Sequence, residues 1–110
     1  MEGPQDAPLM RSVDDASLLL ESCFSAGTRS ALLYAENLPE RFFDLSSGEA
    51  GAILQKLKNY GVRLAVVCPP GRVAFSSRFP EMAAEERATG WFGIFESADA
   101  ARQWLQANSA

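Results

Sequence analysis

An aspartate, two serines and a glycine open a helical pattern in the segment DLSSG, residues 44–48. A serine hydroxyl in this position can cap a helix, carry a phosphate or contact a partner. Ser46 is followed three residues later by Glu49, which is the spacing of a capping box. We therefore expect Ser46 to be the N-cap of a helix, and its removal to cost about 1 kcal/mol.

The capping box does not explain Ser47, Gly48 or Gly51. Each glycine lowers helix propensity by nearly 1 kcal/mol, so two of them in the first turns indicate that another backbone or a partner comes close. A phosphate on Ser47 would add about −1.5 to −2 charges at a helix N-terminus, where free N–H groups and the dipole stabilise it. Two interpretations stay open, a constitutive partner surface and a surface switched by phosphorylation.

A second polar cluster follows on the same predicted helix. Gln55 and Asn59 are four residues apart and so share one side of the helix, with Lys56 and Tyr60 beside them. Three hydrogen-bonding side chains and an aromatic ring could form a polar pocket or a dimer seam. The simpler alternative is a solvated helix face on which Tyr60 anchors the last turn.

The residue types exclude several catalytic mechanisms. The sequence contains no histidine, which excludes a Ser-His-Asp triad, a Cys-His pair and histidine-ligated zinc catalysis within one chain. Cys68 precedes Pro-Pro-Gly-Arg, but a phosphatase cysteine requires arginine six positions later, where this chain has Ala74. Arg72 could make Cys68 redox-sensitive, and a small buried cysteine is the alternative. We expect no cofactor and no metal.

Composition and charge narrow the class of protein further. The chain has 110 residues, 47% of them hydrophobic and 22% charged, as expected for one soluble domain. The net charge is −4 and the basic residues are scattered, so we expect no nucleic-acid partner. No apolar run approaches the roughly 20 residues of a membrane span. We expect residues 1–8 to be a flexible leader without signal-peptide features, residues 9–107 to be a single domain, and the location to be cytoplasmic.

Apolar segments alternate with helical patterns along the chain. Strand patterns occupy residues 9–13, 30–35, 62–68 and 91–95, and further helices are indicated near Pro80 and Ser97. Alternating strands and helices imply parallel pairing. We therefore expect a small α/β domain with about four mainly parallel strands and four helices. Two of the helices are indicated by apolar residues at i, i+3, i+4 and i+7, namely Ala16, Leu19, Leu20 and Cys23, and Ala50, Ile53, Leu54 and Leu57.

Partners of a parallel sheet usually contact the loops at the carboxyl ends of its strands. Here these loops are residues 36–44, 69–77 and 96–97, and the opening of the second long helix should lie on the same side. In the last strand, alternation cannot hide Trp91, Phe92 and Phe95 on one face. At an edge of the sheet this strand would expose apolar surface, which is typical of self-association, so we predict a homodimer.

The segment FFDLSSGEAGAILQKLKNYGVRLAVV, which begins at Phe42, resembles a bacterial family of uncharacterised domains, domain-of-unknown-function family 4180. The ending Trp104-Leu105 fits the same family. The resemblance implies a bacterial protein whose biochemical role is not defined. The matching positions are Phe42, Phe43, Asp44, Leu45, Ser47, Gly48, Ala50, Gly51, Gln55, Lys56, Asn59 and Tyr60.

A more distant resemblance is to STAS domains, which include anti-sigma-factor antagonists. These domains place Asp-Ser-Ser-Gly between a strand and a helix, and phosphorylation of one of the serines switches partner binding. This chain has one additional residue, Leu45, between the acid and the serines. The resemblance implies a STAS-like layout and a regulatory role, with Ser47 as the phosphorylated residue.

Two hypotheses for function follow. The first is a non-catalytic cytoplasmic module that binds a protein partner, or itself, through the segment from Asp44 to Gly51. The alternative is a small-molecule-binding protein or modest enzyme, with a pocket between Asp44, Ser47, Gln55, Asn59 and the loop at residues 69–77. The candidate binding residues are Asp44, Ser46, Ser47, Gly48, Gly51, Gln55, Lys56, Asn59 and Tyr60.

Overall fold

The computed structural model describes residues 1–4, 8–71 and 73–108. Within these ranges, four α-helices and a parallel sheet confirm the predicted α/β class. The main elements in chain order are α1 (Ala16–Ser25), β1 (Ser30–Tyr34), α2 (Glu49–Asn59), β2 (Arg63–Val67), α3 (Phe79–Thr89), β3 (Phe92–Phe95) and α4 (Ala98–Asn108). Short 3₁₀ helices precede α1 and connect β1 to α2, namely η1 (Val13–Asp15), η2 (Ala35–Asn37), η3 (Glu40–Phe43) and η4 (Leu45–Ser47).

The sheet has three strands among the described residues, in the order β1-β2-β3, and both pairings are parallel. The register places Ala65 opposite Leu32 in β1 and Gly93 in β3. Strand β2 is therefore central, and Leu64 to Val67 are buried on both faces, which is why these four residues are apolar without alternation.

The prediction of four strands is wrong, because residues 9–13 do not form one. The backbone N–H groups of Leu9 and Met10 both donate to the carbonyl oxygen of Asn37, at 3.1 and 2.8 Å, so this segment is bonded to the end of η2 and not to a strand. The free edge of β1 is instead covered by the chain start. Gly3 donates to the Leu32 carbonyl at 2.9 Å, and Leu32 donates to that of Met1 at 2.8 Å.

The same contacts bear on the expected leader at residues 1–8. Residues 5–7 lie outside the described ranges. Of the others, Glu2 forms a two-pronged ion pair with Arg102 of α4, with both nitrogen–oxygen distances at 2.9 Å. The guanidinium of Arg102, which donates the hydrogen bonds of this pair, holds the pKa of the Glu2 carboxyl below its usual value. These contacts connect the chain start to both β1 and α4.

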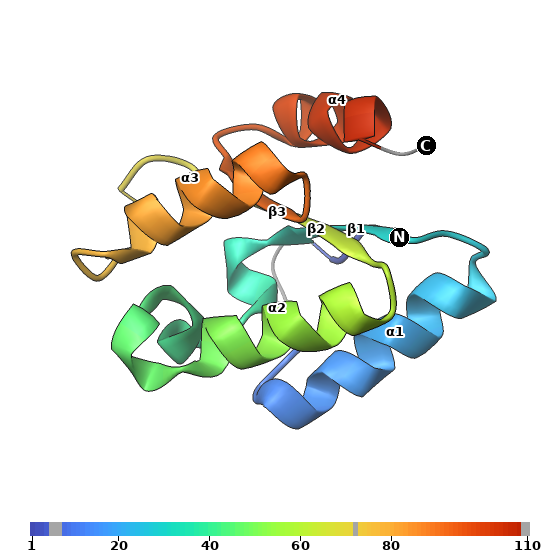
Figure 1. The fold of residues 1–110 in the computed structure, drawn as a ribbon, viewed down its shortest axis with the longest axis horizontal. Helices are drawn as coiled ribbons and strands as arrows, with labels where there is room; N and C mark the ends of the chain where they lie inside the picture. The colour runs from blue at the N-terminus through green and yellow to red at the C-terminus, as the bar shows by residue number, and fades with distance from the viewer. Residues whose placement is uncertain (5–7, 72, 109–110) are drawn as a thin grey trace.

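Helices cover both faces of the sheet. Figure 1 shows α1 and α2 on one side and α4 on the other. The first side includes Leu33, Leu64 and Phe92 from the strands, and the second includes Leu32 and Val67. All eight apolar residues of the two predicted helical stripes are buried, which confirms the helical period used to place α1 and α2.

The last strand does not expose its aromatic residues as expected. Phe92 and Phe95 are buried on opposite faces, and the Phe95 ring packs against Trp104 of α4 with 5.4 Å between centroids. Trp91 is half-buried under the guanidinium of Arg63, 5.0 Å from the ring centre. The large exposed apolar side chains are instead Leu18, Phe24, Tyr60 and Phe75. Homodimerisation stays a prediction without support from this strand.

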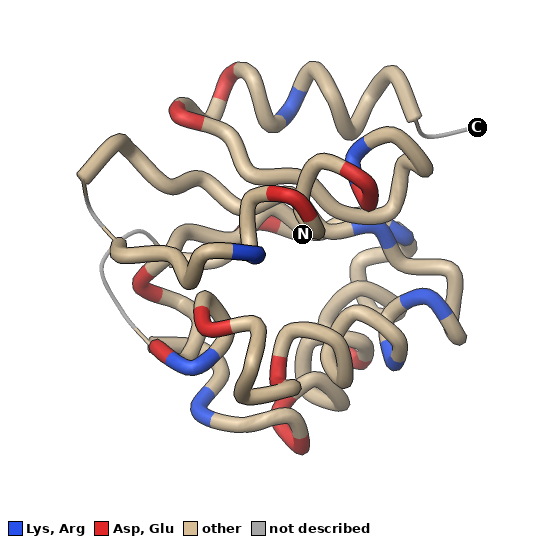
Figure 2. Tube along the Cα trace, turned by 60° about the vertical axis from the view of Figure 1, so that its left-hand side comes forward, with Lys and Arg blue, Asp and Glu red and all other residues tan. Residues whose placement is uncertain are grey.

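Figure 2 shows Lys and Arg distributed over several elements of the chain. Each helix in the described ranges is too short or too polar to cross a membrane.

Candidate functional site

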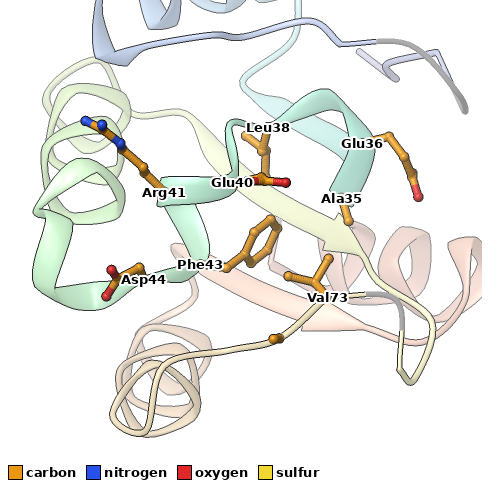
Figure 3. A pocket seen from close by; sticks show the side chains of 9 residues that line it. Ala35, Glu36, Leu38, Glu40, Arg41, Phe43, Asp44 and Val73 are labelled. Carbon is orange, nitrogen blue, oxygen red and sulfur yellow. The ribbon is translucent and has the colours of Figure 1, made fainter.

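A hollow of about 690 Å³ opens at the carboxyl ends of β1 and β2 (Figure 3). Its volume lies within the roughly 300–1,000 Å³ that is usual for ligand pockets. The β1–α2 connection forms one wall and the loop between β2 and α3 forms the other, as expected for the carboxyl ends of parallel strands. The apolar lining consists of Ala35, Leu38, Phe43, Val73 and Ala74.

Charged side chains from η2, η3 and their neighbours surround this apolar lining. They are Glu36, Glu40, Arg41 and Asp44. In Figure 3 the carboxylate of Glu40 lies beside Leu38, whereas the guanidinium of Arg41 points away from Phe43. The Asp44 carboxylate accepts hydrogen bonds from the backbone N–H and the hydroxyl of Ser46, at 3.1 and 2.7 Å.

A serine links the two walls of the hollow. The hydroxyl oxygen of Ser76 accepts the backbone N–H of Leu45 at 2.9 Å, and its own N–H donates to the Phe43 carbonyl at 3.1 Å. Ser76 therefore holds the loop before α3 against η3 and η4. Sequence reasoning missed this residue, because a serine in a loop gives no signal of a partner 31 positions away.

The predicted capping box at Ser46 is wrong. Ser46 lies in η4, where the side chain of Asp44 caps its backbone N–H. The N-cap of α2 is Gly48, with φ of 78°, and Glu49 is the first helical residue instead of the third. The left-handed conformation at Gly48 separates η4 from α2 and so moves the helix start two residues beyond the predicted one.

Ser47, which precedes the N-cap Gly48, supplies a hydrogen-bond acceptor at the start of α2 that was predicted for Ser46. Its hydroxyl oxygen accepts the backbone N–H of Glu49 at 3.2 Å. The same hydroxyl donates toward the carbonyl oxygens of Arg41, at 2.6 Å, and Asp44, at 2.8 Å. Ser47 is exposed to solvent, so it is accessible as well as structural. A phosphate ester would remove the hydroxyl hydrogen and with it the bond to either carbonyl.

The two glycines of this segment have different explanations. Gly48 has a positive φ, which a side chain would strain. Gly51 is helical and exposed, and a Cβ added there would meet no atom within 4 Å. A glycine at position 51 lowers the helix propensity of α2. Packing against the described residues does not require a glycine there, so it gives no reason for this cost.

The second polar cluster lies at the far end of α2, against α1. The amide of Gln55 donates to the Asn59 side-chain oxygen at 2.9 Å, and the Lys56 ammonium donates to the Ser17 hydroxyl at 2.7 Å. The Tyr60 ring meets Phe24 edge-on, with 6.1 Å between centroids. None of these residues lines the hollow, so the structure does not bring Gln55 or Asn59 together with Asp44.

The chain also matches a known family. A family model described as "Domain of unknown function (DUF4180)" matches residues 1–105. The chain belongs to this family. The resemblance seen in the sequence is thereby confirmed over nearly the whole chain. No curated protein and no solved structure matches it, and the STAS likeness stays a prediction.

Both cysteines of this DUF4180 domain are buried thiols that form no disulfide with each other. Cys23 has no exposed surface, and burial raises the pKa of its thiol. Cys68 is 6% exposed at the end of β2, which agrees with the alternative of a small buried cysteine. Arg72, its proposed activator, lies outside the described residues. Those described residues contain no group of three or more side chains able to hold a metal.

A buried asparagine in the DUF4180 domain was also missed by sequence reasoning. Asn37 has no exposed surface, and its side-chain oxygen accepts the backbone N–H of Tyr34 at 2.7 Å. Its amide nitrogen donates to the carbonyl of Pro4 at 2.6 Å. Asn37 thus secures the residues next to the hollow to both β1 and the chain start. An asparagine after a strand indicates a turn, but no sequence pattern identifies these partners.

Proposed function

We propose that this DUF4180 domain is a non-catalytic module that binds another protein through the opening of α2, residues Asp44 to Gly51, here called the α2 rim. The observation that carries the proposal is the exposed glycine at position 51, which has free space where a side chain would stand. A partner backbone lying against the first turn would need that space. Ser46, Ser47 and Gly48, which directly precede α2, are exposed as well.

The location of the α2 rim supports the same proposal. Asp44 belongs both to the rim and to the lining of the hollow, so a partner on one can extend into the other. Ser47 and Ser76 hold the rim in one conformation, which lowers the entropy that a partner has to overcome on binding. The proposed setting is the bacterial cytoplasm, where free cysteines stay reduced. A second copy of the chain is the alternative partner.

A capture experiment tests this proposal. Wild-type protein and Gly51→Arg are immobilised at equal density, exposed to lysate of the source cells, and the captured proteins are quantified by mass spectrometry. Ala107→Arg is the matched control, because it adds the same charge at an exposed position of α4. We expect at least one protein to bind wild type and the control but not Gly51→Arg. Equal capture by all three would contradict the proposal.

Regulation by phosphorylation is a separate part of the proposal and has its own test. The Ser47→Glu variant places a negative charge where a phosphate would lie, and Ser46→Glu places it one residue away. We expect Ser47→Glu to release the captured partner, because the carboxylate cannot donate to the Arg41 or Asp44 carbonyl. Retention of the partner by Ser47→Glu would leave an unregulated binding surface.

The volume of the hollow favours small-molecule binding as the second candidate. A thermal-shift screen against metabolites and nucleotides addresses it, with Ala74→Trp as the test variant because Ala74 is exposed on the wall of the hollow. A ligand that raises Tm in wild type but not in Ala74→Trp would support this candidate. Asn59→Ala is the control, since Asn59 lies outside the lining.

A further inference from the structure

A second hollow, here called the α3 groove, lies between α3 and β3, which are side by side in Figure 1. Its volume is about 300 Å³, at the lower end of the usual range for ligand pockets. Among the described residues that line it, only Arg87 is charged. The apolar lining consists of Phe75, Phe79, Pro80, Ala83, Ala84 and Ile94. The α3 groove is therefore an apolar hollow of small-molecule size with one cation in its wall.

The lining residues of α3 form one stripe along the helix. From Phe79 to Arg87 they stand at i, i+1, i+4, i+5 and i+8, which places them on one side. The two ends of this stripe are separated by roughly 12 Å along the helix axis, and Ala83 lies about halfway. A ligand that contacts Arg87 therefore needs an apolar body of about 6 Å to reach Ala83 and about 12 Å to reach Phe79.

The cation of the α3 groove is held in place by a buried ring. The guanidinium of Arg87 lies over the ring of Phe95, 4.7 Å from its centre, and Phe95 is 5% exposed. A glycine makes this arrangement possible, because a Cβ at Gly93 would lie 2.7 Å from the Phe95 ring and 3.6 Å from the Arg87 side chain. A side chain at position 93 would displace the ring beneath the cation. Arg87 is thus positioned before any ligand binds.

The hydrogen-bond donors of Arg87 are available to a ligand. No described residue forms an ion pair with Arg87 or accepts a hydrogen bond from its side chain. Stacking on Phe95 uses one face of the guanidinium and leaves the N–H groups at its edge. A carboxylate can accept two parallel hydrogen bonds from such an edge. Glu86 of α3 is paired with Lys58 at 2.6 Å, and the other glutamates of this helix lie outside the lining.

We propose that the α3 groove binds a small monocarboxylate with an aromatic or aliphatic body of about 6 to 12 Å. The carboxylate pairs with Arg87, and the body lies along Ala83 and Ile94 toward Phe79. Charge complementarity favours an acid over an alcohol or an amine of the same shape, and the volume limits the ligand to a small molecule. The groove contains no residue of the α2 rim, so this inference does not depend on the proposed function.

The test is an NMR titration of isotope-labelled protein with hydrocinnamate, hydrocinnamyl alcohol and hydrocinnamylamine, which differ only in the terminal group. We expect the acid to shift the amide signals of Ala83, Ala84, Arg87 and Ile94, with a Kd of about 1 mM for so small a ligand. The alcohol and the amine should each bind at least about tenfold more weakly, because neither accepts two hydrogen bonds from a guanidinium. Equal affinity of the acid and the alcohol would overturn the inference.

Two variants locate the two parts of the ligand. Arg87→Gln should weaken binding of the acid about tenfold and leave that of the alcohol unchanged. Its matched control is Arg11→Gln, at an exposed position outside the lining. Ala84→Trp fills the groove and should abolish binding of the acid, whereas Ala107→Trp on the exposed side of α4 should not.

Either variant can contradict the inference. Equal weakening by Arg87→Gln and Arg11→Gln would overturn it, and so would unchanged binding to Ala84→Trp. The wild-type comparison of acid and alcohol decides the outcome if a variant does not fold.

The C-terminus of another protein carries the same chemistry, and a dipeptide distinguishes this source. Acetyl-Gly-Phe has a free carboxylate beside an aromatic side chain. We expect it to bind no more tightly than hydrocinnamate, because a groove of about 300 Å³ has little room for additional backbone. Binding of the dipeptide more than about tenfold tighter would overturn the small acid in favour of a protein C-terminus.

Discussion

Both ends of α2 carry polar residues, but their surroundings differ. The α2 rim has two serines, two acidic residues and two glycines, and the far end has Gln55, Lys56, Asn59 and Tyr60. At the rim, hydrogen bonds connect η3, η4, α2 and the loop before α3, so each polar group positions another segment. At the far end, Gln55 and Asn59 satisfy each other on an exposed face.

The hydrogen bonds at the rim fix the positions of several segments, whereas the bond at the far end joins two side chains on one helix. A polar pair at i and i+4 on an exposed helix contributes only about 0.2–0.5 kcal/mol and leaves the fold unchanged when it is lost. A hydroxyl that bonds three backbone groups in a connection controls where the next helix begins. The binding proposal therefore concerns the rim, whereas Gln55 and Asn59 belong to a solvated helix face.

The largest effect is expected at Gly48. Gly48→Ala forces a side chain into the left-handed region at φ of 78°, and we expect it to lower the free energy of unfolding by about 1–2 kcal/mol. Urea denaturation followed by circular dichroism measures this change. A loss of unfolding free energy below the experimental error would show that the start of α2 can shift without cost. The α2 rim would then not be rigid, and the difference between the two ends of α2 would not hold.

The next effect distinguishes the two serines. Ser47→Ala removes the acceptor for the Glu49 N–H, so we expect a loss of about 1 kcal/mol, whereas Ser46→Ala should lose less than half as much. Both variants are compared with wild type by the same denaturation. The reverse order would restore the capping box at Ser46 and contradict the hydrogen bonds described for Ser47.

Gly51 should respond in the opposite direction. Gly51→Ala replaces an exposed helical glycine where a Cβ meets nothing, so we expect it to stabilise the chain by about 0.5–1 kcal/mol. Differential scanning calorimetry should record a higher Tm. A stabilised variant that also loses its captured partner would be the sharpest support for the rim, while destabilisation would reveal a backbone constraint at this position.

The smallest effect is expected at the far end of α2. Asn59→Ala removes the hydrogen bond from Gln55, and we expect a change of about 0.3 kcal/mol with unchanged partner capture. Stability and capture are both measured, because only capture reports on binding. A large loss of capture would show that the partner binds at the far end of α2, which would contradict the proposed role of the α2 rim.

Much of the fold was predictable because burial leaves a periodic pattern in the sequence. Residues 30–35, 62–68 and 91–95 contain the three observed strands, and the apolar stripes of α1 and α2 match the buried residues. The strand predicted at residues 9–13 failed for a specific reason. Met10 is buried like a strand residue, but its backbone bonds to a carbonyl beyond the end of β1.

The candidate site was predicted less completely. The sequence identified Asp44, Ser47 and Gly51 as residues of interest, and it placed the loop at residues 69–77 on the same side of the sheet. It assigned the cap to the wrong serine, because the spacing of Ser46 and Glu49 does not reveal the positive φ of Gly48. It also grouped Asn59 with Asp44, although Asp44 precedes α2 and Asn59 is the last residue of that eleven-residue helix.

The sequence by itself determined the alternation of strands and helices, the parallel pairing and the central burial of β2, because each depends on local periodicity and on the short connections between neighbours. The tertiary structure decided which polar residues share a surface. That outcome depends on the turns between β1 and α2 and on the contact of Ser76 with Leu45 across 31 positions. Contacts of that kind depend on where the folded backbone places two distant segments. The spacing of residues along the chain does not predict these positions.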